Sequence, residues 1–180
     1  MRTFVAIEIS NQDVLNSITR IQTEFKIKAK PVSIKNIHFT IQFLGEISDK
    51  MSQKIQNELK SIVFEPFDVS ILGMGAFPKP SSPRVIWIGT DEEGGKKLSK
   101  LALEISRKLS NLGFQNDKPF KPHATIFRVK NKIGNISNEL EHYSSYKFGI
   151  QKVFEIKFKK SVLTSDGPMY SDLQVVQAKH

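Results

Sequence analysis

The chain contains no cysteine among its 180 residues. A disulfide framework, thiolate catalysis, Cys-ligated zinc and iron–sulfur clusters are therefore excluded. Long apolar runs are lacking as well: none approaches the roughly 18 residues of a membrane span. Glu8 interrupts the apolar start of the chain, which is typical of a strand and not of a signal peptide. We expect a soluble, cytoplasmic protein with no membrane partner, and the sequence shows no metal-ligand cluster and no sign of a cofactor.

The chain has fewer acidic residues than basic ones. Asp and Glu total 18 against 27 Lys and Arg, so the net charge is +9 at pH 7. Such a surplus attracts polyanions, and nucleic-acid phosphates are their usual source. Five lysines crowd one β-rich segment, residues 147–160. These lysines fit either a track for RNA or an edge strand protected from aggregation.

The pattern of elements predicts an α+β protein with antiparallel sheets, because strands and helices alternate without the regular rhythm of a parallel sheet. We expect residues 1–180 to form a single domain of two similar lobes that face each other. Amphipathic helices are predicted from Ser10, from Ser48 or Asp49 and across 98–112, with a short helix at 138–142. Strands are predicted at 1–9, 34–44, 69–72, 85–88, 124–129, 148–158, 161–164 and 170–176, and a stiff proline-rich loop at 73–83.

One short pattern occurs twice, once in each half of the chain. His38-Phe39-Thr40-Ile41 and His123-Ala124-Thr125-Ile126 both read His-x-Thr-apolar. Residues two apart on a strand point to the same face, so each segment presents an imidazole beside a hydroxyl. The other two histidines lack this setting: His142 is predicted to be a solvated surface residue and His180 a mobile terminal one.

Two facing imidazoles suit the cleavage of a phosphodiester from which a ribose hydroxyl leaves. That reaction needs a base on one side and an acid on the other, and histidine titrates near neutrality and fills either role. Threonine hydroxyls donate hydrogen bonds to non-bridging oxygens, and a nearby Arg or Lys neutralises the remaining charge. This chemistry needs no metal.

The sequence resembles the two-histidine (2H) phosphoesterase superfamily, and within it the RNA 2′,3′-cyclic phosphodiesterase family, also labelled 2′-5′ RNA ligase. The resemblance spans essentially the whole chain. It rests on residues 38–45 (HFTIQFLG), 122–128 (PHATIFR), 2–7 (RTFVAI), 77–87 and 163–170 (LTSDGPMY).

The resemblance implies a bilobal α+β fold with a pseudo-twofold axis, in which each lobe brings one His-x-Thr strand to a basic central cleft. It implies that His38 and His123 are catalytic and that Thr40 and Thr125 bind phosphate. The family's arginine, five residues beyond the second histidine, falls on Arg128. Strand alternation puts an odd offset on the opposite face, so Arg128 reaches the cleft only if a bulge or the strand end redirects it.

The predicted function is hydrolysis of RNA 2′,3′-cyclic phosphate ends to 2′-phosphomonoesters, by a monomer whose partner is RNA with such ends. Three alternatives stay open. The same residues could perform 2′-5′ ligation at cyclic phosphate ends, with a ribose hydroxyl in place of water. The histidines could instead belong to a non-catalytic RNA-binding module, or to a phosphodiesterase for small cyclic nucleotides or ADP-ribose-type substrates.

Overall fold

The computed structural model describes residues 1–179. Its helices are α1 (Gln12–Glu24), α2 (Asp49–Lys60), α3 (Glu92–Ser110) and α4 (Ser137–Glu141), with one 3₁₀ turn, η1 (Ile34–Asn36). Its strands are β1 (Arg2–Glu8), β2 (Lys30–Pro31), β3 (His38–Glu46), β4 (Phe67–Lys79), β5 (Ser82–Thr90), β6 (Ala124–Arg128), β7 (Lys147–Val153), β8 (Glu155–Thr164) and β9 (Gly167–Gln177).

The strands form one antiparallel sheet in the order β7-β4-β5-β6-β3-β1-β8-β9, and β2 pairs with β6. Two four-stranded halves meet at the centre, where Phe39 of β3 lies opposite Ala124 of β6. Each His-x-Thr segment thus belongs to the innermost strand of its own half. The predicted α+β class, with two antiparallel halves related by pseudo-twofold symmetry, is confirmed.

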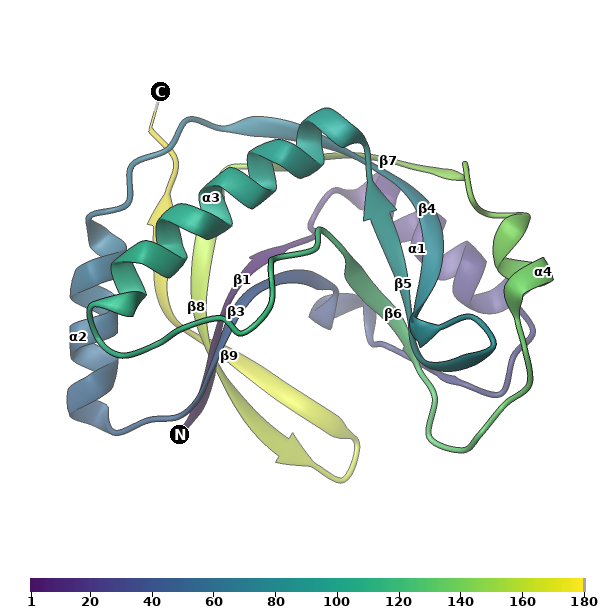
Figure 1. Cartoon of the computed structure of the whole chain (residues 1–180), viewed down its shortest axis with the longest axis horizontal. Helices are drawn as coiled ribbons and strands as arrows, with labels where there is room; N and C mark the ends of the chain where they lie inside the picture. The colour runs from purple at the N-terminus through teal and green to yellow at the C-terminus, as the bar shows by residue number, and fades with distance from the viewer. Residues whose placement is uncertain (180) are drawn as a thin grey trace.

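The helices cover the sheet from both ends. Figure 1 shows α2 at one end of the molecule, α1 and α4 at the other, and α3 running between them along one side. Each long helix buries one apolar stripe, as the periodicity predicts. In α1 the stripe is Val14, Ile18 and Ile21. No helix within residues 1–179 is long and apolar enough to cross a membrane.

Helix α1 begins one residue later than predicted. Its N-cap is Asn11, whose side chain accepts a hydrogen bond from the backbone N–H of Val14, and not Ser10. The backbone N–H groups of Ser10 and Asn11 both donate to the Gln151 side chain in β7, at 2.8 Å each. This contact across 140 residues fixes where the helix starts. Helix α2 begins after its predicted cap, Ser48.

Three sequence predictions of secondary structure are wrong. The strand predicted at 34–44 begins only at His38, because residues 34–36 form the 3₁₀ turn η1. Residues 73–83 do not form a loop, because β4 and β5 continue through them as one long hairpin. Pro78 and Pro83 pair near its tip, where a missing backbone donor costs little. The predicted strand 148–158 is two strands that separate at Phe154: β7 pairs with β4 in one half, and β8 pairs with β1 in the other.

Candidate active site

His38 opens β3 and has both ring nitrogens engaged. Its Nδ1 lies 2.6 Å from the carbonyl oxygen of Asn36, and its Nε2 lies 2.9 Å from the hydroxyl oxygen of Thr40. A carbonyl only accepts, so Nδ1 carries the proton in the neutral ring. Nε2 then accepts from the Thr40 hydroxyl and is the nitrogen available for proton transfer.

His123 repeats this arrangement immediately before β6. Its Nδ1 lies 2.6 Å from the carbonyl oxygen of Lys121, which again stands two residues before the histidine. The same tautomer follows, and Nε2 has no hydrogen-bond partner among residues 1–179. The two halves therefore present two imidazoles in the same tautomer, with Nε2 unprotonated in both; in His38 this nitrogen accepts from Thr40, whereas in His123 it has no partner among residues 1–179.

A cleft of about 980 Å³ brings these groups together. Its lining draws on both innermost strands, on β2 and η1, and on the tip of the β8–β9 hairpin. All five site residues predicted from the sequence line it: His38, Thr40, His123, Thr125 and Arg128.

Arg128 reaches the cleft because β6 contains a bulge. Phe127 pairs with Ile86 of β5 but Thr125 pairs with Trp87, so Ile126 is an extra residue on its strand. Ile126 and Phe127 are both buried, and the alternation resumes one residue later with Arg128 exposed toward the cleft. Alternation along a regular strand would point Arg128 away from the cleft, and this bulge turns it toward the cleft.

Strand β3, in the other half of the sheet, contains the same kind of bulge. Ala6 of β1 pairs with Thr40 and Val5 pairs with Gln42, so Ile41 is the extra residue. Ile41 and Gln42 are both buried, and the residue five beyond the histidine, Phe43, is exposed. The equivalent position thus holds an aromatic ring in one half and a guanidinium in the other, and of the two only Arg128 lines the cleft.

Burial controls the titration of both histidines. It lowers the pKa of His38 to about 4; the bond to Asn36 opposes this, while the nearby charges of Lys159 and Arg128 add to it. The pKa of His123 is lowered too, mainly by burial. Both rings are therefore neutral at pH 7 in the free protein.

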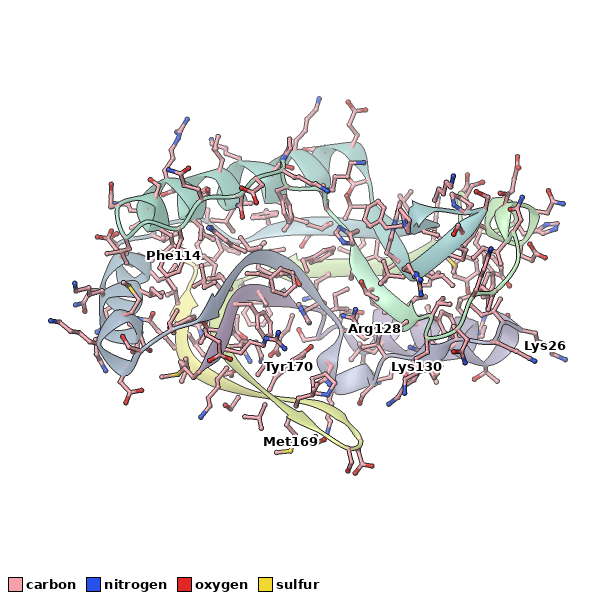
Figure 2. All side chains as sticks on the ribbon, turned by 60° about the horizontal axis from the view of Figure 1, so that its bottom comes forward. Lys26, Phe114, Arg128, Lys130, Met169 and Tyr170 are labelled. Atoms are coloured by element: carbon pink, nitrogen blue, oxygen red, sulfur yellow. The ribbon has the colours of Figure 1, made fainter. Side chains whose placement is uncertain are left out.

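Aromatic rings hold each imidazole from the side. The ring centroids of Phe4 and Tyr170 lie 5.1 and 5.6 Å from that of His38, and those of Phe77 and Trp87 lie 4.9 and 6.1 Å from that of His123. Burial raises the pKa of the Tyr170 hydroxyl, which keeps it protonated and able to donate. Figure 2 shows Tyr170 on the yellow ribbon of β9, across from Arg128.

An ion cluster stands beside His38 on β1, β8 and β9. Lys159 contacts Glu8 and also Asp172, at 2.6 Å, and Lys157 lies 3.1 Å from each of the same carboxylates. Burial opposes ionisation of Lys157 and Asp172, but their mutual hydrogen bonds outweigh it, so the pKa of Lys157 is raised and that of Asp172 lowered. Two of the five lysines in 147–160, the half-buried Lys157 and the buried Lys159, are thus engaged in ion pairs and neither bind RNA nor protect an edge strand.

The other two histidines and the remaining cations of the cleft differ in how far the sequence predicts their positions. His142 is exposed beyond α4 and away from the cleft, as predicted. His180 lies outside the described residues. The cleft-lining Lys35, Arg84 and Lys130 were missed because only their position in the fold distinguishes them from other exposed cations. No group of three or more His, Asp or Glu side chains within residues 1–179 is placed to hold a metal ion.

Comparison with known proteins places the chain in a family. A family model described as LigT like Phosphoesterase matches residues 7–87. An RNA 2′,3′-cyclic phosphodiesterase of Archaeoglobus fulgidus is 40% identical over 98% of this chain and 100% of its own. One from Methanocaldococcus jannaschii is 38% identical over 94% of this chain and 96% of its own. The chain belongs to the RNA 2′,3′-cyclic phosphodiesterase family.

Solved structures agree on the fold. The crystal structure of TT0787 of Thermus thermophilus superposes with a TM-score of 0.81 at 26% identity, and each chain covers 100% of the other. Escherichia coli LigT complexed with 3′-AMP gives a TM-score of 0.83 at 21% identity, covering 99% of this chain and 98% of that one. The likeness of fold thus extends over the full length of the chain, beyond the residues that the family model matches.

Proposed function

We propose that this protein opens RNA 2′,3′-cyclic phosphate ends to 2′-phosphomonoesters, with His38 and His123 as an acid–base pair. The observation that carries the proposal is the shared cleft, into which two separate halves each bring an imidazole with Nε2 available. One chain supplies both histidines, so we propose that it works as a monomer.

In this reaction water attacks phosphorus while one imidazole Nε2 takes its proton. A new P–O bond forms, the bond from phosphorus to the ribose 3′-oxygen breaks, and the other imidazole, protonated at Nε2, gives its proton to the departing oxygen. An imidazole can perform either transfer, as a base when neutral and as an acid when protonated. The phosphate stays on the 2′-oxygen as a monoester.

The remaining residues of the site stabilise the phosphate. In the free protein the Thr40 hydroxyl donates to His38, so substrate binding turns it toward a non-bridging oxygen and releases Nε2. We assign Thr125 the matching role in the other half. Arg128 carries a fixed charge that offsets the negative charge of the pentacoordinate transition state.

The test is incubation of the protein with an oligonucleotide that ends in a 2′,3′-cyclic phosphate, with EDTA in excess, followed by identification of the product isomer. A 2′-phosphate is expected, with the rate unaffected by the chelator. A 3′-phosphate product, or a rate restored only by a divalent ion, contradicts the proposal. Adding a second RNA with a free 5′-hydroxyl shows in the same reaction whether the ends are joined instead.

A further inference from the structure

The cleft holds more cationic side chains than a cyclic phosphate can use. Five line it, and they face a single carboxylate, that of Asp166. None of the five forms an ion pair within residues 1–179. A 2′,3′-cyclic phosphate carries one negative charge, which Arg128 beside the two threonines already meets. The five are Lys30, Lys35, Arg84, Arg128 and Lys130.

Three of these cations form a row that leads away from the histidines. Lys30 of β2 pairs directly with Arg128 of β6, and paired residues share a sheet face. Lys130 stands two residues beyond Arg128, with the buried Val129 between them. Figure 2 shows Arg128 and Lys130 following one another along the green ribbon. The cleft therefore presents an imidazole, a hydroxyl and a guanidinium in order toward the end of β6, with the ammonium group of Lys30 beside the guanidinium on β2 and that of Lys130 just past the end of β6.

The wall of the cleft that faces these cations is largely apolar, and its one charge is negative. It is the tip of the β8–β9 hairpin, where Leu163 is 76% exposed, Pro168 lies opposite it, and Asp166 is the only charged residue. The hairpin is held against the cleft by the Asn36 side chain, which donates to the carbonyl oxygen of Pro168 at 3.2 Å. Phosphates are repelled by Asp166 and attracted to the β2–β6 wall, so the two walls orient a bound strand.

We propose that Lys30 and Lys130 form a second phosphate subsite, which binds the phosphodiester on the 5′ side of the terminal nucleotide. The inference rests on the proposed function, because it takes the cyclic phosphate to lie at the two histidines. The subsite requires an RNA end at least two nucleotides long. It therefore predicts that the protein prefers an oligonucleotide over a mononucleoside cyclic phosphate.

The experiment compares two double variants that lose the same charge. Lys30→Gln/Lys130→Gln removes the subsite. Lys28→Gln/Lys132→Gln is the matched control, since these two lysines are exposed, stand two residues away in sequence and do not line the cleft. Each is assayed on a trinucleotide and on a mononucleoside, both ending in a 2′,3′-cyclic phosphate. The affinity for a trinucleotide ending in a 2′-phosphate is measured in parallel, at several salt concentrations.

The wild type is expected to prefer the trinucleotide. In the subsite variant kcat/KM for the trinucleotide falls about tenfold and the salt dependence of its affinity weakens, while kcat/KM for the mononucleoside stays within about twofold. The control variant matches the wild type on both substrates. Equal losses on both substrates, or equal losses in the two variants, would overturn the subsite. The binding measurement decides the same question even if no turnover occurs, an outcome that would count against the proposed function alone.

Discussion

At the scale of single residues, the two histidines act as one unit. Each fixes its tautomer through a carbonyl two residues earlier, and each presents Nε2 to the same cleft. A displacement that needs a base and an acid in one step fails when either is missing. Their loss is therefore not expected to be additive in free energy.

We expect His38→Ala and His123→Ala each to lower kcat on a 2′,3′-cyclic end by about 10²–10⁴-fold. The double variant should be scarcely slower than the weaker single variant. His142→Ala is the control, because His142 is exposed and distant from the cleft. Single-turnover rates on all four proteins, with far-UV circular dichroism to check folding, measure this. Normal turnover in either folded single variant would refute the pairing.

The lowered pKa values set the pH dependence of the reaction. The base must be neutral and the acid protonated, so kcat/KM peaks between the two pKa values of the free protein. Both lie below the ordinary value of 6.5, that of His38 at about 4. We expect kcat/KM to fall as pH rises above about 6.5. A profile from pH 4 to 9 on a mononucleoside cyclic phosphate tests this, and an optimum above pH 7 would show that burial does not control these rings.

At the scale of elements, β6 shows which features of the site can be predicted from the sequence and which cannot. Alternation along a strand is a local rule, so it placed His123 and Thr125 on one face correctly. The bulge at Ile126 depends on how β5 and β6 pair, and no local pattern encodes that pairing. Strand alternation therefore predicts that Arg128 needs a bulge or a strand end to reach the cleft, but it does not predict whether that bulge exists. The same reason explains why the ion pair of Lys159 with Glu8 was not predicted, because β8 and β1 are far apart in the sequence and are neighbours only in the folded sheet.

The β4–β5 hairpin supports His123 through a glycine. Trp87 lies over Gly75, where an added Cβ would stand 2.2 Å from the indole ring, and the indole in turn packs against His123. We expect Gly75→Ala to displace the indole, to destabilise the fold by about 1–3 kcal/mol and to lower kcat. Gly134→Ala is the control, because nothing lies within 4 Å of its added methyl group. Urea unfolding and kcat are the measurements, and unchanged values for Gly75→Ala would contradict this packing.

At the scale of the whole molecule, the two halves of the sheet have similar topology but place their histidines in different environments. The sheet places β3 and β6 side by side at its centre, and each contributes a histidine, a threonine and a bulge. Aromatic rings flank both histidines, but His38 is more deeply buried than His123 and also has the ion cluster of Glu8, Lys157, Lys159 and Asp172 beside it. His38 therefore lies in the more costly environment for a proton, and this couples the site to the stability of the fold.

The coupling predicts how the stability of the protein changes with pH. Because the pKa of His38 is about 4 in the folded protein and about 6.5 when unfolded, the unfolded chain binds more protons between these values. The contribution of His38 to stability is fully present above pH 6.5 and is lost as pH falls toward 4, at no more than about 1.4 kcal/mol per pH unit. Urea unfolding of the wild type and of His38→Gln at pH 7.5, 6, 5 and 4.5 isolates this contribution from the carboxylates. The difference in unfolding free energy between the two proteins should shift in favour of the variant as pH falls, and a difference that stays constant would show that His38 gains its proton as easily folded as unfolded.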